Sequence, residues 1–575
     1  MSRKAGRNWW NGFVGTTMES EPLRANDDNE IRGVIVQPDP VAPKFVPLSQ
    51  ETGLTASSRS DFTEEIRHDL SLSGQRRDIQ SRLKDYFAPS DLPDEIQLLN
   101  WKNLAIPVCY LVVGTLQGLF RTLLNVYPLG LGATEAQQTT LSTIATIPAA
   151  FKMVYGFTTD NIPLFGYRRK PYIFMGWVFA SFMMLQLILT SDLTMAWDPE
   201  TGDPVPPEGA PSITQLSVTF LLFGISMWFA DATMDAVVVE KARCEPTDRR
   251  GSLQSTCYAF RFAGLMVCAP LSNYLYTHVG PQIVVHILML VPTVMFPLSL
   301  VMEEECDLPL ASFRDQCTDI WQTVCSRSIW EPMGFIYLFN LCQVPNAAWR
   351  QFLRTVLHFT DVQLNNLLVA SYTMLYAGTM IYKYCFLHAS WRRIYLGCIL
   401  MNAVFSALQL LLIRGNTFGL TPFLFALGDD AMAEFISGVQ FLPTAILMVA
   451  LTPAGSEGAA YAMYTTVWNS AMMIAPAVSS VLLEIWDTSV ETMKAGQLDG
   501  LFNLSLLTTG LQVLPVLFLC WMPHGRDELH ALAGKTGSGH AAGGVIFLAI
   551  LGMSMAWTLA VAVLNIIRPG WAGAS

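Results

Sequence analysis

Charged residues deep inside long apolar segments are the part of this sequence most able to do chemistry. Asp231 and Asp235 stand one helical turn apart in one such segment, and Arg261 lies near the middle of the next. Lys152 lies in an earlier segment, close to its end. An ionised side chain costs about 3 kcal/mol or more at the centre of a bilayer, so it faces a protein interior and finds a partner. These residues predict ion pairing, proton binding or contact with a charged solute.

The two aspartates leave three roles open. Repulsion between two close carboxylates favours proton uptake by one of them, whereas a nearby cation opposes it. Structural pairing, proton coupling and substrate contact therefore remain alternatives for Asp231 and Asp235. Arg261 lies too far from either end of its segment to reach the headgroups, and we expect Asp231 or Asp235 as its counter-charge. Lys152 fits a gate or a ligand contact equally well.

A second group of charged residues occupies a short turn between two apolar segments. It contains Asp160, Gly166, Arg168 and Arg169 within a stretch too short to form a domain. Such a turn between moving helices needs charge pairs that hold one arrangement. We predict that these four residues form a conformational latch, paired with charged groups or helix ends of neighbouring spans.

Other spans carry polar and aromatic residues at helical spacing, which indicates a polar face inside the bundle. Asn340, Gln343, Arg350 and Arg354 are interpreted as one stripe on the seventh span, and Glu434 as the only deep carboxylate of the second half. Flat aromatic rings can stack on a planar solute. The predicted substrate-binding residues are Arg261, Asp231, Trp228, Tyr258, Gln117, Lys152, Glu434, Tyr372 and Trp468.

The elements that position these residues are membrane spans. The 575 residues are 52% hydrophobic and 14% charged, and a spanning helix needs about 20 apolar residues. The predicted class is an all-α polytopic membrane protein. Its spans are predicted at 103–126, 134–156, 171–190, 212–239, 251–278, 282–302, 329–355, 363–386, 393–413, 429–451, 457–484 and 499–522.

The spans divide into two sets of six. Arg168-Arg169 precedes the third span and Arg392-Arg393 precedes the ninth, so each set has a basic turn at the same place. Two six-helix halves related in this way describe the major facilitator fold. The predicted parts are a disordered cytoplasmic tail at 1–100, bundles at 101–302 and 329–525, a cytoplasmic loop at 303–328, and an extra apolar helix at 541–568.

Lys and Arg in the loops predict the orientation. The loops that follow even-numbered spans hold nearly all of the loop cations, whereas the opposite loops hold only Arg414 and Lys494. The positive-inside rule then places the N-terminus in the cytoplasm. We expect a multi-pass protein, in the plasma membrane rather than an organelle.

Several classes of function are disfavoured by the sequence. The sequence has no basic patch with interleaved aromatic residues, which is the pattern that would predict nucleic-acid binding. The cysteines and histidines form no metal-binding pattern, and no HExxH motif predicts a membrane-embedded enzyme. We therefore expect no catalytic site, no metal and no cofactor; the expected partners are a small-molecule substrate, the lipid bilayer and a coupling proton.

Three segments together resemble the folate–biopterin transporters of the major facilitator superfamily. The first runs from Lys152-x-x-Tyr155-Gly156 through Asp160 to Tyr167-Arg168-Arg169-x-Pro171-Tyr172. The second is Asp231-x-x-x-Asp235-Ala236-x-Val238-Val239-Glu240-x-Ala242-Arg243, followed by Gly251-x-Leu253-Gln254-Ser255. The third is Pro453-x-Gly455-x-Glu457-Gly458, with Asn469 downstream. The resemblance covers residues 100–525, and the apolar segment after residue 540 departs from it.

The resemblance implies proton-coupled uptake of folates or pterins by alternating access. Such a solute suits the predicted residues, because a carboxylate binds the donor edge of a pterin ring and cations bind the carboxylates of a folate tail. The alternatives left open are a facilitator for another small organic solute and a non-transporting nutrient receptor of the same fold.

Overall fold

The computed structural model describes most of the chain beyond residue 92. The described residues are 93, 96–133, 135–197, 204–246, 251–306, 313–346, 348–453, 455–482, 485–525, 528–529 and 541–567. They belong to one compact unit, Arg77–Ser575. Most of the tail predicted at 1–100 lies outside the described residues, and its prediction stays untested.

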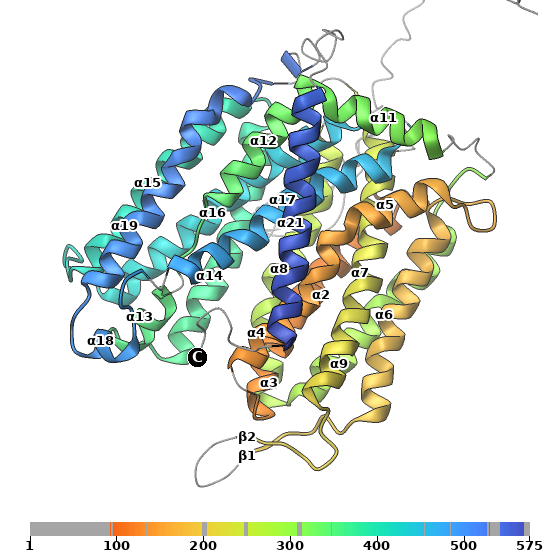
Figure 1. The fold of residues 1–575 in the computed structure, drawn as a ribbon. Coiled ribbons are helices and arrows are strands. Elements are labelled where there is room, and N and C mark those ends of the chain that lie inside the picture. Colours follow the sequence, from red (N-terminus) through yellow and green to blue (C-terminus); the bar gives the residue numbers. More distant parts are fainter. Residues whose placement is uncertain are drawn as a thin grey trace, which may run out of the picture. The chain divides into compact units, whose positions relative to one another are not determined.

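The first half of the unit is built from helices with one small hairpin between them (Figure 1). Strands β1 (Ala196–Trp197) and β2 (Pro204–Val205) pair antiparallel in that hairpin. The helices are α2 (Ala105–Asn125), α3 (Tyr127–Gly130), α4 (Glu135–Thr146), η1 (Ile147–Phe151), α5 (Lys152–Asn161), α6 (Lys170–Thr190), α7 (Ile213–Ala242), α8 (Ser252–His278), α9 (Pro281–Leu290), η3 (Val291–Val294) and α10 (Met295–Val301).

The second half repeats this helical pattern. Its elements are α12 (Arg327–Leu341), α13 (Trp349–Thr355), α14 (Asp361–Ile381), η4 (Tyr382–Phe386), α15 (Trp391–Ile413), α16 (Pro422–Leu451), α17 (Glu457–Leu482), α18 (Val490–Lys494), α19 (Asp499–Val513) and η5 (Leu514–Trp521). Helix α11 (Phe313–Cys325) connects the halves, and α21 (Ala541–Ile567) follows them.

Apolar composition and proline account for the form of the spans. Seven of the described helical stretches are long and apolar enough to cross a membrane by length and composition. Others are segmented. Pro148, Pro292 and Pro515 each occupy the second position of a 3₁₀ segment in the second, sixth and twelfth spans. Proline has no N–H to donate and clashes with the preceding turn, so the α-helix changes form there.

Two sequence predictions within the second half are wrong. The stripe from Asn340 to Arg354 is not one helical face, because the helix stops at Leu341 and resumes only at Trp349. The tenth span begins at Pro422 instead of 429. Thr421 accepts a hydrogen bond from the backbone N–H of Leu424, and proline at the first helical position favours a helix start.

The earlier start of α16 adds a buried carboxylate to the second half. Asp429 lies two turns inside α16 and is buried, so Glu434 is not the only deep carboxylate of this half. Helices α7 and α16, the fourth and tenth spans, each have 30 residues and a Ser or Thr cap. Their match supports the twofold repeat of the fold.

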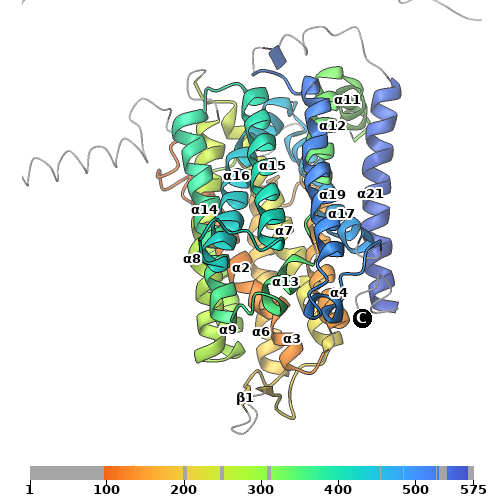
Figure 2. The same ribbon diagram turned by 90° about the vertical axis from the view of Figure 1, so that its left-hand side faces the viewer.

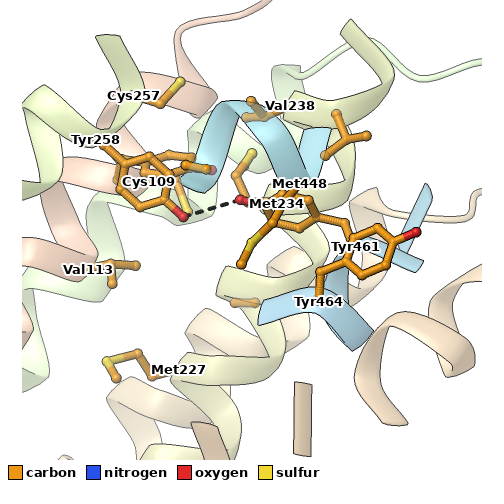
Figure 3. Packing of buried hydrophobic residues seen from close by; sticks show 14 of the residues in the cluster. Cys109, Val113, Met227, Met234, Val238, Cys257, Tyr258, Met448, Tyr461 and Tyr464 are labelled. Atoms are coloured by element: carbon orange, nitrogen blue, oxygen red, sulfur yellow. Dashed lines mark hydrogen bonds between the residues drawn. The ribbon is translucent and has the colours of Figure 1, made fainter. Parts of the chain in front are cut away.

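The two halves pack directly on each other. Helix α5 packs on α17, and α8 packs on α14 and α16. Figure 3 shows the buried side chains of this region, with Cys109 and Tyr258 from the first half near Met448 and Tyr461 from the second. A side chain at Gly156 would collide with the carbonyl of Gly458, so the close approach of α5 and α17 requires glycine there.

The predicted extra helix at 541–568 is present as α21. It packs against α4, α11, α12 and α17, and Figure 2 shows it along the edge of the bundle. Val545, Ile546 and Met553 leave an exposed apolar face on α21. Helix α11, in contrast, lies inside the segment that was predicted as a loop at 303–328.

Candidate functional site

Four charged side chains from three helices meet inside the first half. The ammonium of Lys152 lies 2.5 Å from Oδ2 of Asp231 and 3.0 Å from Oδ2 of Asp235. The guanidinium of Arg261 pairs with the other oxygen of Asp231. The hydroxyl of Tyr110 donates to Oδ1 of Asp235 at 2.6 Å. We call these five residues the charge cluster.

Local geometry explains why they converge. Asp231 and Asp235 are four residues apart on α7, so both project from one face. Lys152 is the first residue of α5, directly after the 3₁₀ turn that contains Pro148. The predicted counter-charge of Arg261 is confirmed, since Asp231 binds it.

Burial strengthens the attraction between the opposite charges of the cluster and restricts the movement of their side chains. The exposed fraction is 1% for both aspartates, 3% for Lys152 and 7% for Arg261. Two cations balance two carboxylates, so the cluster is close to neutral if all four are ionised. Nε of Arg261 is buried and has no hydrogen-bond partner among the described residues. A buried charged donor without an acceptor is uncommon in folded proteins.

Aromatic rings surround the cations of the cluster. Nζ of Lys152 lies 4.9 Å from the Trp228 ring, and Cζ of Arg261 lies 5.2 Å from the Tyr110 ring and 5.4 Å from the Tyr258 ring. These distances are within the range of cation–π attraction. The second half contacts these aromatic rings through Tyr461 of α17, whose hydroxyl lies 3.4 Å from that of Tyr258.

The other predicted binding residues lie outside the cluster. Trp468 connects to it through Phe441, whose ring centroid is 5.0 Å from Trp468 and 4.5 Å from Tyr258. Tyr372 instead contacts Arg121, whose Cζ is 5.1 Å from its ring centroid. Glu434 and Gln117 are half-buried, and within the described part of the chain neither forms a hydrogen bond or salt bridge with the cluster.

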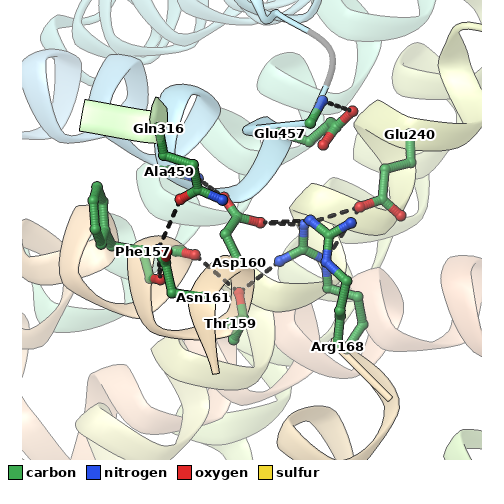
Figure 4. A network of polar contacts seen from close by, with 12 residues as sticks. Phe157, Thr159, Asp160, Asn161, Arg168, Glu240, Gln316, Glu457 and Ala459 are labelled. Carbon is green, nitrogen blue, oxygen red and sulfur yellow. Dashed lines mark hydrogen bonds and ion pairs between the residues drawn. The ribbon is translucent and has the colours of Figure 1, made fainter. Parts of the chain in front are cut away.

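The predicted latch residues form a second buried network (Figure 4). Nη2 of Arg169 lies 2.5 Å from Oδ1 of Asp160 and 2.9 Å from Oε1 of Glu240, and Nη1 donates to Thr159 at 2.6 Å. Arg168 reaches Asp160 at 3.2 Å. Gly166 has a φ of 82°, which the turn before Arg168 requires and which glycine adopts without strain.

This network joins the two halves. The backbone N–H of Ala459, at the start of α17, donates to Oδ2 of Asp160 at 2.6 Å. Nearby, Arg243 of the first half pairs with Glu457 of the second. A carboxylate at the N-terminus of a helix is stabilised by the free N–H groups and the helix dipole. Asp160 therefore acts on its own turn and on the opposite half at once.

Sequence reasoning missed several partners in these networks. Tyr110 lies in the first span, 125 positions from its partner Asp235, and nothing in its own helix indicates that contact. Glu240 and Glu457 stood in the family-like segments without an assigned role. Glu304, from the acidic run between the halves, accepts the backbone N–H groups of Arg168 and Arg169 at 2.8 and 2.7 Å. That contact joins residues far apart in the chain, so no local pattern could reveal it.

The helical architecture is the major facilitator fold. Among solved structures, a bacterial homologue of the iron transporter ferroportin in its outward-facing state matches with a TM-score of 0.52 at 13% identity, covering 75% of this chain and 99% of that chain. The proton:xylose symporter XylE matches with the same TM-score at 12% identity, covering 75% of this chain and 98% of its own. At these identities the similarity shows the fold alone.

The chain belongs to the BT1 family, whose sequence profile matches residues 114–535. The folate-biopterin transporter of Synechocystis is 27% identical over 75% of this chain and 83% of its own length. Folate transporter 1 of Plasmodium falciparum is 24% identical over 66% of this chain and 71% of its own. A probable folate-biopterin transporter 2 of Arabidopsis thaliana is 24% identical over 68% and 76%. The protein is thus a multi-pass membrane transporter, and not an enzyme.

Proposed function

We propose that this protein moves folate- or pterin-type anionic aromatic solutes across a membrane by alternating access, coupled to protons. The observation that carries the proposal is the charge cluster, in which two carboxylates, two cations and flanking aromatic rings lie inside the first half, next to Tyr461 of the second half. The relatives named for folate and biopterin support this class of solute.

The chemistry of the cluster suits such a solute. The free Nε of Arg261 offers a donor to a carboxylate, and Trp228 and Tyr258 offer faces for a flat ring. An aspartate released by an incoming anion can accept the N–H donors of a pterin edge. The same cations therefore hold the aspartates when the site is empty and the solute when it is full.

The negative charge of the proposed solute is the reason to propose proton coupling. Moving an anion into a negative interior costs about 2.3 kcal/mol per charge per 100 mV, so accumulation of a folate needs an accompanying cation. A substrate anion that takes Arg261 from Asp231 leaves two buried carboxylates, Asp231 and Asp235, to share the one cation of Lys152. Protonation of one carboxylate removes the cost of the excess buried charge. Asp231 and Asp235 are the proposed proton carriers.

The latch completes the cycle. Asp160, Arg168 and Arg169 hold the two halves together at the end where α17 begins. We propose that this end is cytoplasmic, as the loop cations indicate, and that its opening alternates with opening of the opposite end. The orientation places the N-terminus in the cytoplasm, and we propose the plasma membrane as the location. We propose the two bundles, residues 101–302 and 329–525, as the parts that move relative to each other.

The decisive experiment separates coupling from transport. Radiolabelled folate and biopterin are offered to transport-deficient cells at two pH values, with wild-type protein, Asp231→Asn and Asp235→Asn at matched surface expression. We expect each variant to lose accumulation driven by a pH gradient and to retain exchange of preloaded substrate. Accumulation by both variants with an unchanged pH profile would refute these carriers.

The two alternatives give different results in the same experiment. A facilitator for another solute would take up neither compound, and other labelled solutes would fail to be displaced by folate. A nutrient receptor would bind the label at the surface without internalising it.

A further inference from the structure

A cavity lies away from the charge cluster, between α21 and the second half. It has a volume of about 450 Å³, within the range of small-molecule pockets. Its walls come from α12, α17, η5 and α21, with Trp330 and Trp521 among the lining residues. All of the side chains that line it are apolar or aromatic, apart from the Tyr337 hydroxyl. We call this cavity the α21 groove.

The one hydroxyl in the α21 groove is already satisfied. Oη of Tyr337 lies 2.8 Å from Oγ of Ser554, which ties α12 to α21. The wall also holds the buried indole N–H of Trp330, which has no hydrogen-bond partner among the described residues. A buried water needs two to four polar partners, so this single donor has little to offer water. An empty apolar space also forfeits dispersion contacts along its walls. Its natural occupant is an apolar chain.

The groove continues into the membrane-facing surface of the protein. Ile546 lines it and is also 59% exposed, beside exposed Val545 on the same helix. Figure 2 places α21 at the edge of the bundle, where lipid surrounds a multi-pass protein. An acyl chain can therefore enter from the bilayer without crossing polar surface.

We propose that the α21 groove binds one acyl chain of a bilayer lipid. Lipid tails are as apolar as the groove, so the hydrophobic effect alone gives no preference for binding. Preference comes from van der Waals contact, which grows with the number of walls around the chain. Four elements surround the groove, whereas an ordinary lipid-facing surface offers one.

The structure supplies its own comparison. A cavity of about 440 Å³ lies along α19 and is lined by Trp486 and six residues of the segment 503–514. One helix forms nearly all of its wall, so it should hold a chain less well. Gly334 lies in the α21 groove and Gly510 in the α19 cavity, which gives a matched pair of glycines.

The test uses the full-length protein in phosphatidylcholine vesicles with a trace of phosphatidylcholine that carries a photoactivatable diazirine in its acyl chain. Cross-linked peptides are mapped by mass spectrometry in wild type, Gly334→Phe and Gly510→Phe. A β-carbon at Gly334 would contact the Trp521 ring at an ordinary 3.5 Å, and Gly510 has nothing within 4 Å. We expect α12 and α21 peptides to be labelled several-fold more than α19 peptides, and Gly334→Phe alone to remove the excess.

Equal labelling of the three helices in wild type would overturn the proposal, as would excess labelling that survives Gly334→Phe. If Gly334→Phe fails to fold, Ile546→Trp narrows the groove from its exposed wall and gives the same readout. Labelling of α21 that Ile546→Trp leaves unchanged would then overturn it.

Discussion

The two halves contain equivalent basic turns, yet the structure uses them differently. In the first half, Arg169 is buried and binds Asp160 and Glu240. In the second, Arg392 donates to the backbone carbonyls of Met522 and Cys520, in its own half. No carboxylate partner of Arg392 is recorded among the described residues.

Carboxylates account for this difference. Asp160 stands eight residues before Arg168, and the equivalent position before Arg392 is Tyr384, which is 60% exposed. Without an acid there, Arg392 stays within its own half, and Lys383 at the start of this turn reaches the first half through a hydrogen bond to Thr256 at 2.8 Å. Asp160 also accepts the N–H of Ala459 across the interface. Two similar basic strings thus give one latch between halves and one brace within a half.

Removal of the buried arginine is the most severe test of this comparison. Arg169→Ala leaves Asp160 buried without its closest cation, and breaking one side of a buried pair costs about 3–5 kcal/mol. We expect a large fall in the thermal unfolding temperature in detergent and loss of uptake. Arg392→Ala leaves no carboxylate unpaired and should cost clearly less. Equal losses in the two variants would contradict the assigned difference.

A methyl group at the interface is the next strongest perturbation. The β-carbon of Gly458→Ala would lie 2.8 Å from both Oδ1 of Asp160 and Nη1 of Arg169, so the pair must shift. Overpacking of this kind costs about 1–3 kcal/mol. We expect slower uptake at normal expression. Gly397→Ala, after the second turn, has nothing within 4 Å and serves as the control.

Arg168 should matter less than Arg169. Its side chain is 16% exposed and lies 3.2 Å from Asp160, so this contact is longer and more exposed to solvent than that of Arg169. We expect Arg168→Ala to slow exchange between states while the protein stays in the membrane, with a stability loss of about 1 kcal/mol. Initial uptake rates at matched surface expression measure this. Unchanged uptake would show that Arg168 is not part of the latch.

The smallest expected effect concerns Glu304. Its carboxylate accepts three backbone N–H groups at the start of α6, including that of Lys170 at 2.7 Å. Glu304→Gln keeps the shape but removes the charge and replaces one acceptor oxygen by an NH2 group, so the loss should be about 0.5–1 kcal/mol, in the range of a charge near a helix N-terminus or of one hydrogen bond. The unfolding temperature should fall slightly and uptake should persist. A loss as large as that of Arg169→Ala would show that the acidic loop also belongs to the latch.

The sequence alone determined the class and the place of most spans, although not every helix end. Apolar length is a local property, because about 20 residues must cross the bilayer regardless of their neighbours. The charge of Arg261 demanded a counter-charge for the same reason, and Asp231 provides it. Where a helix end depended on capping, the signal was also local: Thr421-Pro422 marked the start of α16, although hydropathy alone placed it later.

Only the tertiary structure decided which carboxylate meets which cation. Lys152 lies 79 positions from Asp231, and Asp160 meets Ala459 across 299 positions. Spacing along one helix cannot report contacts between helices, so it could not show that Glu434 and Tyr372 lie outside the charge cluster. The same holds for the α21 groove, because its walls come from four elements and none of them shows a cavity by itself. Local physics fixes helices, whereas packing fixes the partners of their side chains.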